Sequence, residues 1–165
     1  MDNRNNNLDI KSLFLEELIE EFKKQGLPAF RAKQVFEWLH VKLAGNYEEM
    51  TNLPKQLRET LNEKYPIVLL EEVDSLRSKT DGTIKYLFRL KDNRVIESVL
   101  MKYHHGNSVC ISSQVGCRMG CKFCASTIGG KERDLLPSEM LDQVYRIQAL
   151  SEERVSNVVV MGTGE

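Results

Sequence analysis

All four cysteines of this 165-residue chain lie between positions 110 and 124. Three of them, Cys117, Cys121 and Cys124, share the loop "VGCRMGCKFCAS" with the spacing Cys-x3-Cys-x2-Cys. A disulfide framework would spread its cysteines along the chain, and the polar N-terminus "MDNRNNNLDI" lacks an apolar signal segment. We therefore expect a cytoplasmic protein with reduced thiols. Clustered cysteines in that compartment indicate metal binding or catalysis.

The residue chemistry leaves three interpretations of the cysteine loop. A thiol cluster without a ligand would make a poor core, because glycines and basic residues surround it. A zinc site needs four ligands, and Cys110 on a predicted strand is available as the fourth. An iron–sulfur cluster on three thiolates leaves one iron open, as catalytic metal sites keep an open position. Gly116 and Gly120 favour the cluster, because glycine lets a loop wrap closely around an inorganic core.

The first part of the sequence predicts three helices. Apolar residues recur at helical spacing in three successive segments, and Gly26 and Gly45 separate these segments. Pro28 suits the first turn of the second helix, and Thr51 or Asn52 suits the cap of the third. The predicted organisation is a disordered tail over residues 1–10 and a helical module over residues 11–65.

The periodicity changes after the helical module. In "TIKYLFRL" the apolar residues alternate with polar ones, and turn residues flank the segment on both sides. The segments "RVIESVLMKY" and "NSVCISSQV" are typical of further strands. The sequence therefore predicts an antiparallel meander over residues 66–109 that leads into the cysteine loop. The residues predicted to face one side of the first strand are Ile84, Tyr86, Phe88 and Leu90.

The segment after the cysteine loop predicts a β-α-β unit over residues 110–165. "PSEMLDQVYRIQAL" has helical spacing, with Ser138 as its expected cap and Met140, Val144 and Ile147 on one face. "NVVVMGTGE" is a continuous apolar run closed by glycines, which predicts a strand buried on both faces. Because a parallel sheet needs more than two strands, we expect the chain to be truncated within a larger α/β domain.

Charge and hydropathy limit the partners of this chain. The formal net charge is −1, so no global field attracts nucleic acid or membrane. No apolar run approaches the ~18 residues of a membrane span, and we expect no membrane partner. RNA binding would depend on local clusters such as Arg31, Lys33, Lys55 and Arg58 in the helical module, although charged helix residues often form only a solvated face.

The cysteine spacing, with Phe123 before the last cysteine, resembles the signature of radical S-adenosylmethionine (SAM) enzymes. In that superfamily the open iron of a 4Fe–4S cluster chelates SAM, and reduction cleaves SAM to a 5′-deoxyadenosyl radical. From about residue 11 onward, the chain is similar to the N-terminal half of the dual-specificity RNA adenine-C2 methyltransferases. The segments that carry this resemblance are "FRAKQVFEWLH", "MTNLPKQLRETL", "VCISSQVGCRMGCKFCAS" and "NVVVMGTGE".

The resemblance implies a fold and a set of thiol roles. The fold is an α+β N-terminal part, with a three-helix module and an antiparallel β meander. This part leads into the first β-α-β unit of an incomplete radical-SAM (β/α) partial barrel. Cys117, Cys121 and Cys124 match the ligands of the 4Fe–4S cluster. Cys110 matches the cysteine that helps resolve a covalent RNA adduct, whereas on sequence alone a strand cysteine is usually a small core residue.

The resemblance also assigns three non-cysteine residues. Glu97 matches the proposed proton acceptor, and burial would make it a stronger base. On sequence alone, an outward-facing strand glutamate is the ordinary interpretation. Gly164 and Glu165 match the glycine-rich turn that contacts the amino group of SAM, where an acceptor oxygen suits an ammonium group. Without the family, that segment is a simple strand-to-loop turn.

The family implies 23S rRNA and tRNA as substrates, an electron donor such as flavodoxin, and a monomer. Its methyl group travels on a cysteine near the C-terminus, and no cysteine follows Cys124 here. We therefore expect this chain alone to be inactive. Two alternatives stay open: a related adenine-C8 rRNA methyltransferase, and a non-catalytic, zinc-stabilised RNA-binding module.

Overall fold

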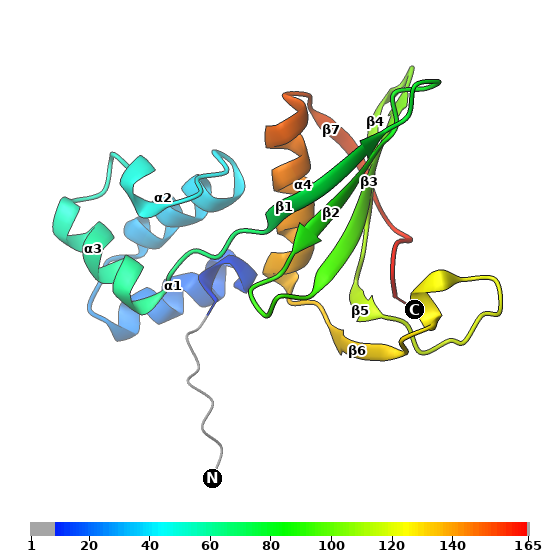
Figure 1. Cartoon of the computed structure of the whole chain (residues 1–165). Helices are drawn as coiled ribbons and strands as arrows, with labels where there is room; N and C mark the ends of the chain where they lie inside the picture. Colours follow the sequence, from blue (N-terminus) through cyan, green and yellow to red (C-terminus); the bar gives the residue numbers. More distant parts are fainter. Residues whose placement is uncertain (1–8, 165) are drawn as a thin grey trace, which may run out of the picture. The chain divides into compact units, whose positions relative to one another are not determined.

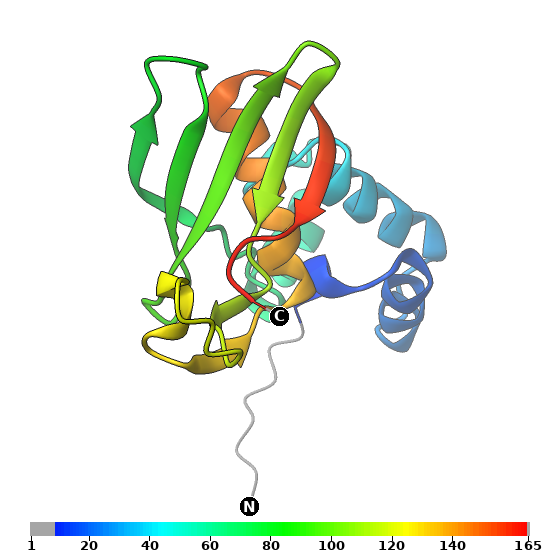
Figure 2. The same ribbon diagram turned by 90° about the vertical axis from the view of Figure 1, so that its right-hand side faces the viewer.

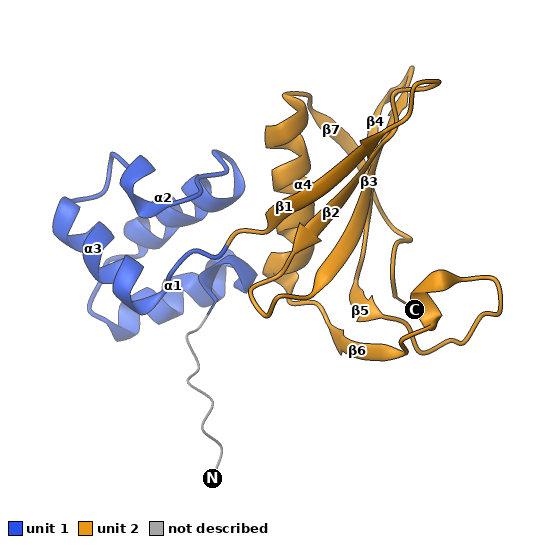
Figure 3. Ribbon diagram, viewed as in Figure 1, with its two compact units in different colours: residues 1–68 blue, residues 69–165 orange. Residues whose placement is uncertain are grey.

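The change from helical to strand periodicity coincides with a division of the chain into two units. The computed structural model describes residues 9–164 and separates residues 1–68 from residues 69–165 (Figure 3). Each unit has its own buried apolar core. The tail predicted over residues 1–10 lies, up to residue 8, outside the described residues.

Unit 1 contains the three helices that the sequence predicts (Figure 1). Leu18 and Phe22 of the first helix pack with Val35, Leu39 and Leu61 of the other two, and all five are almost completely buried. The elements are η1 (Ile10–Ser12), α1 (Leu15–Lys24), α2 (Ala29–His40), η2 (Tyr47–Glu49) and α3 (Lys55–Lys64).

The predicted cap of α3 is wrong. The helix begins at Lys55 with Pro54 in the cap position, not Thr51 or Asn52. The Asn52 side chain instead accepts a hydrogen bond of 2.6 Å from the indole nitrogen of Trp38. Proline at this boundary is favourable because its fixed φ suits the start of a helix.

The sequence spacing predicts the first helix over about residues 11–25 and the second up to Gly45, and the structure differs at both limits. The second helix ends at His40, short of Gly45, and Leu43 takes a left-handed φ of 57° beyond it. The first helix begins after Phe14, which lies at the cap and is exposed. Sequence periodicity includes such flanking residues because it senses apolar spacing and not backbone dihedrals.

Unit 2 is built on one mixed sheet with the strand order β1-β2-β3-β4-β7. Neighbouring strands from β1 to β4 are antiparallel, and β4 and β7 are parallel. Helix α4 connects β4 to β7 and lies behind the sheet in Figure 2. The sheet strands are β1 (Glu71–Arg77), β2 (Ile84–Arg89), β3 (Val95–Tyr103), β4 (Gly106–Ile111) and β7 (Val155–Val160). The predicted β-α-β unit is confirmed.

One face of the sheet forms the core with α4 (Pro137–Ser151). The four apolar residues predicted to share one side of β2 and its flank are all buried, which confirms that alternation. Ile147 of α4 is fully buried in this core, and Met140 and Val144 pack against it. A smaller two-stranded sheet, β5 (Gln114–Gly116) with β6 (Lys131–Asp134), brackets the cysteine loop.

Two expectations for the β-α-β unit are wrong. Ser138 does not cap α4: the cap is Leu136, Pro137 is the first helical residue, and Ser138 is buried inside the helix. Strand β7 is not buried on both faces, because Val158 and Val160 are 48% and 55% exposed. The reason is its place at the sheet edge, where it pairs only with β4.

A buried polar network joins α4 to the ends of the central strands. The Gln143 side-chain oxygen accepts hydrogen bonds from Ser98 Oγ (2.7 Å) and from the Ser112 backbone nitrogen (2.8 Å). Its amide nitrogen donates to the Ser112 carbonyl oxygen at 3.0 Å. Ser112 Oγ donates to the Glu97 carbonyl oxygen (2.7 Å) and accepts from the Thr163 nitrogen (3.1 Å). The network therefore fixes the segments that follow β4 and β7.

We expect Gln143→Leu to lower the free energy of unfolding of unit 2 by at least about 2 kcal/mol. Leucine fills a similar volume but leaves the Ser112 backbone groups and the Ser98 hydroxyl without partners, and each such buried group costs roughly 1–3 kcal/mol. Urea unfolding followed by circular dichroism measures the change. The same substitution at the exposed Gln56 is the control, and equal small effects at both positions would contradict the role of the network.

Candidate active site

Two glycines, Gly116 and Gly130, lie close together where the cysteine loop begins and ends. Gly116 ends β5 with a left-handed φ of 70°, and a Cβ there would overlap the carbonyl oxygen of Gly130. Within the loop, the Cys124 nitrogen donates to the Cys121 carbonyl oxygen at 3.0 Å. Thr127 Oγ1 donates to the Cys124 carbonyl oxygen at 2.9 Å. The backbone between Cys121 and Cys124 therefore forms a tight turn.

The three predicted ligand cysteines line one cavity of about 340 Å³. Cys117 is buried, Cys124 is half-buried and Cys121 is exposed, and none forms a disulfide. Gly162 and Gly164, from the segment after β7, line the same cavity. In Figure 1 the yellow cysteine loop lies beside the red segment that follows β7. Two distant parts of the sequence therefore meet at the thiols.

The donor set of this cavity fits a cluster better than a single ion. Within residues 9–164, no group of three or more His, Cys, Asp or Glu side chains is arranged to hold one metal ion. Zinc needs its four ligands around one ion, and Cys110 is not among the residues that line the cavity. In an iron–sulfur cluster each thiolate binds a different iron, so the sulfur atoms need not converge on one point.

The glycine-rich segment after β7 is held tightly against the end of β4. The Gly162 nitrogen donates to the Ile111 carbonyl oxygen at 3.0 Å, and a Cβ at Gly162 would meet that carbonyl. The nitrogens of Ser113 and Gln114 both donate to the Thr163 carbonyl oxygen. Gly164, with φ of 127°, has no room for a side chain beside Ser113. Only glycines allow this approach.

Of the two residues predicted to contact SAM, the structure places one. Gly164 lies in the wall of the cysteine cavity, and its contact with SAM stays a prediction. Glu165 lies outside the described residues. The exposed Phe123, between Cys121 and Cys124, lines the cavity as well.

Glu97 lies on the sheet face opposite α4. Its neighbours Ile96 and Ser98 are buried on the α4 side, so the Glu97 side chain points the other way. It is exposed and forms an ion pair of 3.0 Å with Lys85 on β2. The burial that would make this carboxylate a stronger base is therefore not observed.

A second cavity, lined in part by Glu97, shares Ser126 with the cysteine cavity. Glu97 and Lys85 line a space of about 370 Å³ together with Ser126 and Thr163. Ser126 also lines the cysteine cavity, and its hydroxyl is 3.3 Å from that of Thr163. The candidate base and the candidate cluster ligands therefore line two cavities that adjoin at Ser126.

Cys110 shares the sheet face of Glu97. Its neighbours Val109 and Ile111 are buried in the core with α4, so the Cys110 side chain projects to the opposite face. Cys110 pairs with Val99 on β3, two residues beyond Glu97. The Cys110 thiol on β4 and the Glu97 carboxylate on β3 are thus diagonal neighbours on adjacent strands. Cys110 is half-buried and lines neither of the two cavities.

Sequence reasoning missed Lys85, Ser126 and Thr163 as parts of this region. Ser126 and Thr163 carry no spacing signal of their own. Lys85 was recognisable only as a polar residue on the outer side of its strand. Its pairing with Glu97 follows from the register of β2 and β3, in which Lys85 is opposite Val99. Opposite charges on diagonal positions of adjacent strands are the signal that could have found it.

The four basic residues proposed for RNA contact differ in their surroundings. Arg58 pairs with Glu48 at 3.1 Å, and Lys55 approaches Glu59 at 3.8 Å. Arg31 donates instead to neutral acceptors, the side chain of Gln34 and the Asn52 carbonyl oxygen. Carboxylates therefore offset the positive charges of Arg58 and Lys55 but not that of Arg31.

Comparison with known proteins identifies relatives of this chain. Residues 8–67 match the family described as "Ribosomal RNA large subunit methyltransferase N-terminal domain". The "Probable dual-specificity RNA methyltransferase RlmN" of Lachnoclostridium phytofermentans is 64% identical over 96% of this chain and 44% of its own length. The protein of the same description from Lachnospira eligens is 63% identical over 95% of this chain and 45% of its own length. This chain is similar to the N-terminal half of RlmN proteins.

A solved structure supports the same assignment. The crystal structure of a radical SAM methyltransferase from Sphaerobacter thermophilus superimposes with a TM-score of 0.86 and 41% identity. The match covers 95% of this chain and 47% of that protein. The chain thus spans about half the length of its RlmN-family relatives. Among the described helices, none is long and apolar enough to cross a membrane.

Anaerobic reconstitution tests the three-cysteine site. We expect the chain to bind about four irons and four sulfides. Charge transfer from thiolate to iron should give an absorption band at about 400 nm. Cys117→Ala should abolish this content because it removes the buried ligand. Cys110→Ala should leave it unchanged, since that thiol lies outside the cavity. Equal loss of metal in both variants, measured by iron and sulfide analysis, would favour a closed four-cysteine site.

Proposed function

We propose that this chain belongs to an enzyme that methylates carbon 2 of an adenine in 23S rRNA and in tRNA by radical SAM chemistry. The observation that carries the proposal is the meeting of Cys117, Cys121, Cys124 and Gly164 in one cavity, which adjoins the cavity of Glu97. The names of the RNA methyltransferase relatives support the substrate class. The proposal includes a cytoplasmic monomer and an electron donor of the flavodoxin type.

The cysteine loop would hold a 4Fe–4S cluster through its three thiolates, with SAM as the further ligand. When bound, the cluster and SAM supply a reductively generated 5′-deoxyadenosyl radical. The protein contributes the enclosure: Gly116 and Gly130 close the loop, and Gly162 and Gly164 bring main-chain groups up to the same space. A polar main chain that approaches this closely suits the amino and carboxylate groups of SAM.

Glu97 would accept a proton during methyl transfer. An exposed ion pair is weak, so the Glu97 carboxylate can leave Lys85 at little cost and turn towards an adenine. The hydroxyls of Ser126 and Thr163 line the cavity of Glu97, and Ser126 also lines the cysteine cavity. A substrate base that enters the second cavity would thus be within reach of both the carboxylate and the radical source.

Cys110 would release the product. In this family the methyl group travels on a further cysteine, which this sequence does not contain. Release of the methylated RNA requires a thiolate that attacks the sulfur of the bridged adduct, as in thiol exchange. A disulfide forms between the two cysteines and the carbon–sulfur bond breaks; its electron pair stays with the methylene carbon, which takes up a proton to become the methyl group. Cys110 faces the same side of the sheet as Glu97 and is not a cluster ligand in the proposed arrangement, so it is available for this step.

In an enzyme that extends this chain to the length of its relatives, Glu97→Gln should slow methyl transfer by about 10²–10⁴-fold, because a general base is lost. Cluster content and SAM binding should not change. Mass spectrometry of the RNA nucleosides measures the product. Glu71→Gln is the matched control, since Glu71 also forms a cross-strand ion pair, with Arg89, but lines neither cavity. Equal rates for both variants would show that Glu97 is only a solvated strand residue.

In the same extended enzyme, Cys110→Ala should accumulate a covalent protein–RNA species, because the resolving thiolate is missing. A denaturing gel with labelled RNA should show a retarded band that nuclease removes. The band should disappear when the methyl-carrying cysteine is also replaced. Normal turnover of Cys110→Ala without such a band would make Cys110 a packing residue.

A further inference from the structure

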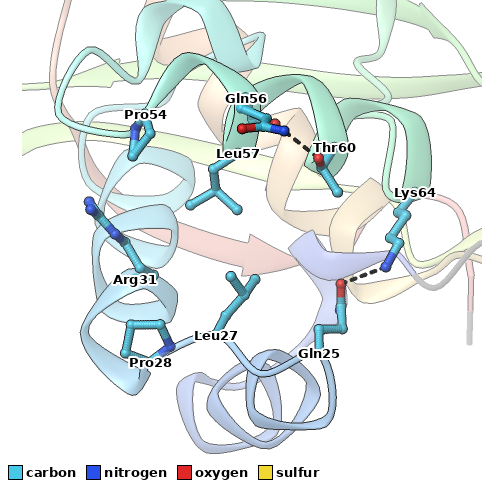
Figure 4. Close-up of a pocket in the computed structure, with 9 residues that line it drawn as sticks. All are labelled: Gln25, Leu27, Pro28, Arg31, Pro54, Gln56, Leu57, Thr60 and Lys64. Carbon is cyan, nitrogen blue, oxygen red and sulfur yellow. Dashed lines mark hydrogen bonds between the residues drawn. The ribbon is translucent and has the colours of Figure 1, made fainter.

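The helical unit contains a cavity of its own that none of the roles above uses. It has a volume of about 410 Å³ and is lined by α2, α3 and the turn before α2. Figure 4 shows Leu27 and Leu57 pointing toward each other across its centre, with Arg31 and Lys64 on opposite sides. The cavity therefore combines an apolar centre with two separated cations.

The apolar part of the cavity has the size and chemistry of a site for one flat ring. Leu27 and Leu57 are half-buried and rest on the core of unit 1, so the floor is fixed. Pro28 and Pro54 add rigid apolar surface at the rim. The face of a nucleobase is largely apolar, and burying it against these aliphatic side chains is favourable.

The charges of the cavity are all positive. Arg31 and Lys64 are the only charged residues in its lining. Arg31 donates to Gln34 and to the Asn52 carbonyl oxygen, and Lys64 donates to Gln25 at 3.0 Å. Among the described residues, neither cation has a carboxylate partner. Neutral acceptors orient these side chains without cancelling their charge, which leaves both free to attract phosphate.

Two further features strengthen the positive potential. Pro28 and Pro54, both in the lining, occupy the cap positions of α2 and α3, and neither helix has a side-chain cap. The positive ends of two helix dipoles therefore lie at the same cavity. By contrast, Lys24, Lys55 and Arg58 of the same unit each pair with a glutamate.

We propose that this cavity binds one unstacked nucleotide of the RNA substrate. The base lies against Leu27 and Leu57, and the flanking phosphates contact Arg31 and Lys64. A paired base cannot enter such a space, so the cavity selects unpaired over duplex RNA. The inference rests on the proposed function only in taking RNA as the substrate.

Fluorescence anisotropy with this chain tests the cavity. The probes are a short labelled single-stranded RNA, the duplex that contains the same strand, and an abasic strand with the same number of phosphates. We expect the single strand to bind more tightly than the duplex, and the abasic strand to bind about tenfold more weakly than the base-bearing one, because it loses the buried apolar face of the base. Equal binding of all three probes would overturn the proposal.

The variants separate the cavity from general surface charge. Arg31→Gln with Lys64→Gln should abolish the preference for single strands. The same double variant should also make the slope of log K against log[salt] shallower by about 1.4, which corresponds to the loss of two phosphate contacts. Lys33→Gln with Lys55→Gln is the matched control: it removes the same charge from the same two helices, at positions outside the cavity. Equal effects of the two pairs, or no effect of the cavity pair, would overturn the proposal.

Two further measurements keep the result unambiguous. Lys64 is exposed, and its hydrogen bond goes to a side chain and not to the backbone. Lys64→Gln alone should therefore reproduce part of the loss of single-strand preference without changing thermal unfolding. Formation of 5′-deoxyadenosine from SAM without RNA, in an enzyme of the relatives' length, tests the proposed radical chemistry separately. If that activity is present and the single strand has no advantage, the cavity proposal fails while the proposed function stands.

Discussion

The position of the candidate site depends on the buried amide of Gln143. This one side chain satisfies the backbone nitrogen and carbonyl of Ser112 and the hydroxyl of Ser98 inside an otherwise apolar core. Ser112 in turn contacts the backbone of Glu97 and Thr163. Buried polar groups that are fully paired specify one arrangement, because any slip leaves a group unsatisfied. The ends of β3, β4 and β7 therefore meet in a fixed register.

The chemistry follows from what that register brings together. The segment after β7 can approach the end of β4 only through glycines, and it delivers Gly162 and Gly164 to the cavity of the three cysteines. Ser126 links this cavity to the space lined by Glu97. In the proposed function, the first cavity would hold the radical source and the second would hold the proton acceptor. The helical unit supplies a separate cavity whose charges suit RNA.

Local patterns predicted most of the fold. Alternation identified β2, the two segments that follow it were assigned as further strands and form β3 and β4, and helical spacing identified the four α-helices. The missed strands were β1 and β6, because "EEVDSLR" and "KERD" are too polar to show an apolar face. Spacing and resemblance pointed to the cysteines, Glu97, Cys110 and Gly164, but only strand register could reveal that Lys85 pairs with Glu97. The exposure of Glu97 agrees with the interpretation from sequence alone, an outward-facing strand glutamate.

The central claim is that three thiolates hold a cluster whose remaining iron is open to SAM. Electron paramagnetic resonance of the reduced, reconstituted enzyme tests this most directly, with the chain extended to the length of its relatives. We expect the g-values of the cluster to change when SAM is added, because the cofactor becomes a ligand of the fourth iron. A cluster signal that is identical with and without SAM would contradict an open iron at Cys117, Cys121 and Cys124.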